Sequence, residues 1–183
     1  MFRSKRRELQ ENIAKTNIDI LISLIPMLLA AFLVYQVTPI LVILSAVVAS
    51  ELAEVIFSLL IQRKKETLKD LSGIVIGALT GLALAPFTPL YVAAFAGAMA
   101  TLFGKVIYGE TEKKIFNPVI LGKLFVLTFF PAVLASNSAA WANPEVLNIS
   151  ESTSLPSLIL TDRGIIGELS IIAMVLGAIY LLF

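Results

Sequence analysis

The sequence predicts an all-α polytopic membrane protein with six transmembrane helices, of which the third is short or broken, and with a cytoplasmic N-terminus. Of its 183 residues, 58% are hydrophobic and 15% are charged, and its mean hydropathy is +0.92. Soluble domains average about 45–50% apolar and about 25% charged residues. The apolar excess lies in long uninterrupted runs, and the basic residues lie between alternate runs. Both patterns are typical of helices that cross a bilayer.

Six apolar segments make up a single membrane domain over residues 1–183. We expect them at residues 18–35, 39–61, 71–85, 88–108, 118–135 and 165–183, after a polar lead-in at residues 1–16. Most approach the roughly 20 residues that a helix needs to cross about 30 Å of hydrocarbon. The third is shorter, and Pro86 and Pro89 follow it, which indicates a short or broken helix.

Charge asymmetry predicts the orientation of these segments. Lysine and arginine gather in the lead-in, between the second and third segments, and between the fourth and fifth. The alternate loops contain a single basic residue, Arg163, which lies in the long loop at residues 136–164. Because basic loops stay in the cytoplasm, we expect the N-terminus inside and this loop on the outer face of the plasma (inner) membrane.

The third segment carries Gly73, Gly77 and Gly81 at a spacing of four. Such spacing commonly serves close helix packing, which is the favoured interpretation. The alternative is a backbone that a ligand or ion approaches closely. Before the fifth segment, Asn117-Pro118 predicts a helix start, because asparagine is a good N-cap and proline is favoured at the first helical position.

Charged residues inside the segments are candidates for function, because they are costly in lipid. Glu51 and Glu54 lie three residues apart on one face of the second segment, either as ion-path carboxylates or, for Glu54, in a packed ion pair. Lys105 and Lys123 lie near cytoplasmic ends, where we expect them to snorkel towards water. Glu168 begins the sixth segment, where capping is the expected role.

Several classes of function are excluded by composition. The chain has no cysteine and no histidine, so it supplies no ligands for iron–sulfur clusters, no histidine or cysteine axial ligand for haem, and no histidine-based zinc site. The net charge of +1 and the absence of a basic stripe argue against nucleic-acid binding. No metal site is expected, and no arrangement of residues suggests a hydrolytic centre.

Several passages together resemble the RnfD/NqrB family, the flavin-bearing membrane subunits of ion-pumping Rnf and Nqr redox complexes, with RnfD the closer. The similarity is collinear over most of the chain. Its passages are Ala53-Glu54, Asp70 with Gly77, Leu82 and Pro86, Gly104-Lys-Val-Ile-Tyr-Gly109, Ile115-Phe-Asn-Pro-Val-Ile-Leu-Gly122, Phe129-Phe-Pro131, Gly164-Ile-Ile-Gly167-Glu168 and Leu176-Gly-Ala-Ile-Tyr-Leu181.

The resemblance implies an FMN that is covalently attached to Thr153 by a phosphodiester bond. In the family, the outer loop carries Ser-Gly-Ala-Thr-Pro-Leu, and here Ser150-Glu-Ser-Thr-Ser-Leu155 stands in that place. By the same resemblance Ser150, Ser152, Asn117 and Pro118 are further cofactor-binding candidates. A riboflavin is also implied, at a site that this sequence does not place.

The implied function is that of a membrane flavoprotein subunit of an Rnf-type ion-translocating ferredoxin:NAD oxidoreductase. It relays electrons within a translocase built with other membrane and peripheral subunits, and it is not a complete enzyme alone. The family has further spans beyond the six found here, so we expect a shortened form or part of a longer chain. The alternatives are a half-size channel or transporter that dimerises, and a flavin-free membrane scaffold.

Overall fold

The computed structural model describes residues 2–57, 71–107, 116–134, 165–168 and 170–182, with side chains from residue 12 onward except that of Glu168. In these ranges all regular structure is helical. The long elements are α1 (Phe2–Tyr35), α2 (Thr38–Phe57), α3 (Ser72–Leu82), α4 (Leu90–Thr101), α5 (Pro118–Phe129) and α9 (Ile171–Leu182). Two short ones are the π-helical turn η3 (Leu102–Val106) and the 3₁₀ turn η5 (Ile166–Glu168).

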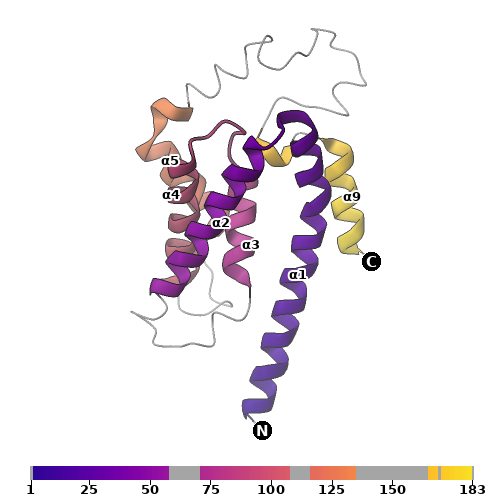
Figure 1. Cartoon of the computed structure of the whole chain (residues 1–183). Helices are drawn as coiled ribbons and strands as arrows, with labels where there is room; N and C mark the ends of the chain where they lie inside the picture. Colours follow the sequence, from indigo (N-terminus) through magenta and orange to yellow (C-terminus); the bar gives the residue numbers. More distant parts are fainter. Residues whose placement is uncertain (1, 58–70, 108–115, 135–164, 169, 183) are drawn as a thin grey trace.

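The helices form two groups (Figure 1). Helix α2 packs against both α3 and α4, and α5 packs on α4, so these four helices make a bundle. Helix α1 extends well past the bundle at its N-terminal end and pairs with α9. The buried apolar core lies within the bundle and under the second half of α1, so polar groups in the bundle are shielded from solvent on several sides.

The outer surface of the described helices is apolar. On α2, Leu44, Val48 and Leu52 follow one another at helical spacing and are each at least half exposed. An apolar stripe of this length is costly in water but is the expected surface towards lipid. Two described helices are long and apolar enough to cross a membrane, at Asn12–Tyr35 and Thr38–Phe57. The structure therefore agrees with a helical membrane protein, and the six crossings remain a prediction.

The prediction of a short third helix is confirmed. Helix α3 has 11 residues and is therefore about 16 Å long, well below the roughly 30 Å of a bilayer core. The packing interpretation of its glycines also holds for two of them. A Cβ added at Gly77 would lie 2.6 Å from Val47 Cα, and one at Gly81 would lie 2.8 Å from Ile43 Cα. Gly73 is different, because it faces carboxylates.

Helix α4 lies against α2 at Gly97, and this contact yields a first stability prediction. A Cβ at Gly97 would collide with the backbone carbonyl group of Ala46, which a side-chain adjustment cannot relieve. We expect Gly97→Ala to destabilise the chain by about 1–3 kcal/mol, as overpacking does, measured by thermal unfolding in detergent. Gly167→Ala is the matched control, because its Cβ would meet Leu82 O at an ordinary 3.4 Å. Equal melting temperatures for the two variants would contradict this account of the α2–α4 contact.

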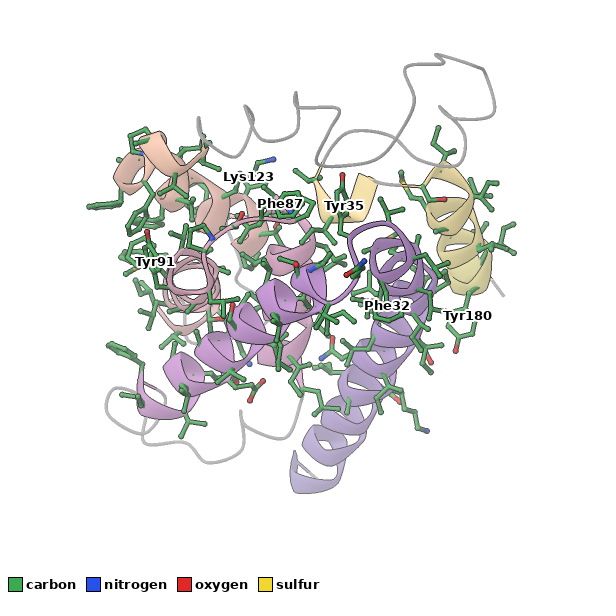
Figure 2. The ribbon with its side chains drawn as sticks, turned by 45° about the horizontal axis from the view of Figure 1, so that its top comes forward. Phe32, Tyr35, Phe87, Tyr91, Lys123 and Tyr180 are labelled. Atoms are coloured by element: carbon green, nitrogen blue, oxygen red, sulfur yellow. The ribbon has the colours of Figure 1, made fainter. Side chains whose placement is uncertain are left out.

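Aromatic rings join the elements at two places. A continuous series of rings lies between α4 and α5, with neighbouring ring centroids 4.8–6.2 Å apart. Its members, in order of contact, are Phe103, Phe125, Phe129, Phe95, Phe130 and Tyr91. Tyr35, at the end of α1, meets Phe87 edge to face at 5.5 Å (Figure 2). Such pairs contribute about 0.5–1.5 kcal/mol beyond area burial. They hold α5 on α4 and dock α1 on the turn between α3 and α4.

The start of α5 is confirmed and its end differs from the prediction. Asn117 Oδ1 accepts a hydrogen bond of 3.0 Å from Val119 N, and Pro118 is the first helical residue. The apolar run predicts a helix that continues to residue 135, but the helix is interrupted at Phe130 (φ −129°, ψ 46°). The cause is Pro131, because proline disfavours the helical conformation in the residue before it.

The sixth helix also begins later than predicted. Residues 166–168 form η5, and α9 starts only at Ile171. Ile166 is fully buried and its N–H donates to Leu84 O, which ties η5 to the turn after α3. Glu168 therefore lies in η5, ahead of the helix that it was expected to begin. Ser170 caps α9, with its Oγ accepting from Ala173 N at 3.4 Å.

Candidate functional site

A buried polar cluster lies where α2, the start of α3 and the end of α4 meet. It combines two carboxylates, one ammonium group and three hydroxyl groups within an otherwise apolar bundle. Its members are Glu51, Glu54, Ser72, Lys105, Ser50 and Thr101. Polar groups gathered in this way at membrane depth are expensive, so a cluster of this kind is a functional candidate by default.

The centre of the cluster is an ion pair between Lys105 and Glu54. Their exposed fractions are 4% and 2%, so both charges are withdrawn from water. Lys105 Nζ donates to Glu54 Oε1 and also to Ser72 Oγ. A buried pair gains little net stability over apolar residues of similar volume, because desolvation offsets the attraction. Its presence here is therefore better explained by a role other than stability.

The second carboxylate, Glu51, approaches the same point as Glu54. A Cβ added at Gly73 would lie 2.5 Å from Glu51 Oε1 and 2.5 Å from Glu54 Oε2. Only glycine leaves room for both carboxylates at the amino end of α3, where the helix dipole favours negative charge. The residue before α3, Leu71, has φ 55°, a left-handed conformation that costs a non-glycine residue on the order of 1 kcal/mol.

A hydroxyl pair extends the cluster across three helices. Ser50 Oγ donates to Gly73 O at 2.7 Å, and Ser50 Oγ lies 2.5 Å from Thr101 Oγ1. Because the single hydroxyl proton of Ser50 is used on Gly73 O, Thr101 is the donor of the second bond. Ser50 and Thr101 are fully buried. These bonds fix the depth of α2 relative to α3 and α4, and hence the position of the neighbouring glutamates.

The π-helical turn η3 is what positions Lys105. Ile107 N donates to Leu102 O at 3.1 Å, a bond between residues five apart that leaves one more residue in the turn than an α-helix has. The snorkelling predicted for Lys105 is wrong, because its side chain is buried among polar partners. The other lysine, Lys123, is exposed on α5 (Figure 2).

The structure thus brings together some of the predicted site residues and not others. Glu51 and Glu54 converge, and the packed ion pair considered for Glu54 is present. Asn117 and Pro118 lie at the start of α5, outside this cluster, where Asn117 acts as a helix cap. Ser150, Ser152 and Thr153 lie outside the described residues. Within the described ranges, no three or more histidine, cysteine, aspartate or glutamate side chains are grouped so that they could hold a metal ion.

Two members of the cluster, Lys105 and Ser72, are not identified as partners of the glutamates by the sequence patterns above. The signal for Lys105 is present in part, because the predicted topology places it at the same cytoplasmic depth as Glu54. Two opposite charges at one depth of a helical membrane protein are expected to pair. No comparable signal singles out Ser72.

Comparisons with known proteins identify the family. Residues 6–183 match the family described as NQR2, RnfD, RnfE. A protein from Ectopseudomonas mendocina that belongs to an ion-translocating oxidoreductase complex is 41% identical over 69 residues, which are 38% of this chain and 20% of that protein. A protein of the Na⁺-translocating ferredoxin:NAD⁺ oxidoreductase complex from Acetobacterium woodii is 25% identical over 179 residues, 90% of this chain and 56% of that protein.

The similarity to the Acetobacterium woodii protein extends over most of the chain at low identity. The similarity to the Ectopseudomonas mendocina protein is limited to 69 residues but has the higher identity. In both cases the chain spans only part of the relative, at most 56% of its length. The matched range of the family includes every helix from α2 to α9 and most of α1, together with the buried cluster. The chain therefore belongs to the NQR2, RnfD, RnfE family.

Proposed function

We propose that the chain acts as a membrane subunit of an Rnf-type ion-translocating ferredoxin:NAD oxidoreductase. The observation that carries this proposal is the family match over residues 6–183, together with the similarity over 90% of the chain to a subunit of a Na⁺-translocating ferredoxin:NAD⁺ oxidoreductase. A dimerising channel or a scaffold would not require either similarity. The partners are the other membrane and peripheral subunits of the complex, in the plasma membrane.

In this proposal Thr153 carries FMN on the outer face. The threonine oxygen attacks the flavin-side phosphorus of a flavin dinucleotide, the phosphoanhydride bond to the second phosphate breaks, and a nucleoside monophosphate leaves while the hydroxyl proton is released. Ser150 and Ser152 flank the attachment point. A flavin supplies one- and two-electron chemistry, while the protein holds it and tunes it. The support is the position of Ser150-Glu-Ser-Thr-Ser-Leu155 between the fifth and sixth apolar segments, together with the charge asymmetry that predicts an outer loop there.

Glu51 and Glu54 are proposed to lie on the path of the coupled cation. The support is the burial of Glu54 and the convergence of both carboxylates at the amino end of α3, a helix too short to cross a bilayer. Helices that end within the membrane offer polar backbone groups at depth, and ion sites in membrane proteins commonly use them.

Intact mass spectrometry of the subunit, purified with its neighbouring subunits, tests the proposal. We expect the mass of the chain to be increased by one phosphodiester-linked FMN, and we expect deletion of the subunit to abolish ferredoxin-dependent NAD reduction by the membranes. If the chain co-purifies with redox subunits but carries no flavin adduct, its membership of the complex is supported and the covalent attachment of FMN is contradicted. Purification without any redox subunit would contradict the membership itself.

A further inference from the structure

The amino end of α4 is a helix terminus without a side-chain cap, on the side of the membrane that the charge asymmetry predicts to be the outer one. Its cap position is Pro89, whose carbonyl oxygen accepts from Val92 N and Ala93 N at 3.0 and 3.1 Å. The N–H groups of the first two helical residues, Leu90 and Tyr91, have no acceptor in the part of the chain that the structure describes. Two N–H groups are therefore left at a helix end where the dipole favours an anion.

A buried hydroxyl group without a partner lies directly ahead of this helix end. Thr88 precedes the cap residue and is only 3% exposed, yet its Oγ1 has no hydrogen-bond partner among the described residues. Such an atom costs free energy until another polar group reaches it, so it is an independent indication of a bound group. On the other side the helix end is open, because Leu90 and Tyr91 are 47% and 62% exposed (Figure 2).

The loop that contains Thr153 is anchored beside this helix end on both sides. Before the loop, Phe130 packs against Tyr91 with ring centroids 6.0 Å apart. After it, Ile166 N donates at 3.0 Å to Leu84 O, in the turn that leads into α4. About a dozen residues separate Thr153 from Ile166, which span at most roughly 45 Å of extended chain. A group attached to Thr153 is therefore tethered within reach of the amino end of α4.

A phosphodiester fits the donors at this helix end. It carries a negative charge at neutral pH, and its free oxygens accept hydrogen bonds, as phosphates do at the N-termini of other helices. The proposed link between FMN and Thr153 is such a phosphodiester. A covalent tether holds its group at an effective concentration in the millimolar range, so even a seat of millimolar affinity is filled.

We propose that the amino end of α4 is the seat of the flavin phosphate, with the N–H groups of Leu90 and Tyr91 and the hydroxyl group of Thr88 as its donors. This inference rests on the proposed flavin attachment and adds the residues that hold the phosphate. It gives the uncapped helix end and the unpartnered hydroxyl group a single explanation, which neither has within the described fold.

Two matched pairs of variants remove one donor at a time. Leu90→Pro removes the N–H group of the first helical residue, a position where proline is favoured. Pro89 already has the extended backbone (φ −55°, ψ 139°) that a following proline requires. Leu90→Ala is the control, because it shortens the same side chain and keeps the N–H group. Thr88→Val removes the hydroxyl group with little change of shape, and Thr88→Ser is the control that keeps it.

The experiment follows the ³¹P NMR signal of free FMN, titrated to millimolar concentration into the purified Thr153→Ala chain in dodecyl maltoside, a detergent without phosphorus. We expect Leu90→Pro and Thr88→Val, each added to this chain, to weaken FMN binding by about tenfold, because hydrogen bonds to charged groups are the stronger kind. The two control variants should bind FMN as the parent does. Riboflavin has no phosphate, so it should compete with FMN at least about tenfold less well than unlabelled FMN does.

Melting of the flavin-free chain separates a ligand seat from a structural role. Thr88→Val should not lower the melting temperature, because its hydroxyl group has no hydrogen bond to lose. Thr80→Val is the reference, because the hydroxyl group of Thr80 is also buried but donates to Ile76 O at 2.7 Å, so this variant should melt earlier. Equal losses in the two variants would show that Thr88 is bonded within the fold, and would overturn its role in the seat.

Equal FMN affinities in Leu90→Pro and Leu90→Ala would overturn the seat, as would the absence of binding at millimolar FMN, since the tether supplies no higher concentration. Displacement of FMN by an equal concentration of short-chain phosphatidylglycerol would assign the seat to a lipid phosphodiester and overturn the flavin as its occupant. If Leu90→Pro does not fold, Thr88→Val against Thr88→Ser decides. Binding of free FMN requires neither the covalent bond nor partner subunits, so failure here and failure of the proposed function are distinguishable.

Discussion

Replacing Thr153 by alanine is expected to abolish the flavin fluorescence that remains with the subunit in an SDS gel. Alanine has no oxygen with which to form the phosphodiester, so the loss should be complete. The measurement is in-gel fluorescence under ultraviolet light, on subunit produced together with its partner subunits and a flavin transferase. Thr153→Ser keeps a hydroxyl group and is expected to keep fluorescence.

The neighbouring hydroxyl groups provide the controls for this result. Ser152→Ala and Ser154→Ala should remain fluorescent, because they leave Thr153 intact. Fluorescence that persists in Thr153→Ala would move the attachment point to Ser152 or Ser154. A wild-type subunit without fluorescence would contradict covalent flavin attachment altogether.

Breaking the Lys105–Glu54 pair on one side is expected to cause the largest loss of stability. Glu54→Ala leaves the buried ammonium group of Lys105 without this carboxylate. Lys105→Ala leaves the buried carboxylate of Glu54 without this ammonium group. Each should cost about 3–5 kcal/mol, because the buried charge that remains has lost its ion-pair partner. Thermal or denaturant unfolding in detergent, followed by circular dichroism, measures the effect.

The double variant tests whether the two effects share one cause. Lys105→Met combined with Glu54→Gln removes both charges, so we expect it to be more stable than either single alanine variant. Lys123→Met is the matched control, since this lysine is exposed and its replacement should change stability by less than about 0.5 kcal/mol. A double variant that is less stable than both single alanine variants would show that the two residues are not coupled.

Local signals in the sequence predict the features that depend on a few neighbouring residues. The start of α5 is predicted by Asn117-Pro118. The short α3 is predicted by the length of the third apolar segment and by the prolines that follow it. The break at Phe130 is not predicted although Pro131 is a local signal, because the apolar run continues past it and its hydropathy is that of one uninterrupted helix.

The site is predicted less completely, for a different physical reason. The glutamates can be singled out from the sequence by the free-energy cost of placing a carboxylate in lipid, because such a residue in an apolar helix is rarely accidental. Their partner cannot, because Lys105 and Glu54 are 51 residues apart and meet only through the packing of α4 on α2. The direction of Lys105 depends on one extra residue in η3, and hydrophobic periodicity does not reveal such an insertion.

The narrow contact between α9 and α1 has a consequence for how the sequence can diverge. Only Ala173 and Gly177 of α9 are buried, and a Cβ at Gly177 would lie 2.5 Å from Ser23 O. Positions 173 and 177 should therefore accept only small side chains as the sequence diverges, because a larger one would push α9 away from α1. The same restriction applies to Gly77, Gly81 and Gly97 in the bundle, where glycines hold backbones in direct contact. Homologous chains should accordingly retain small residues at these positions.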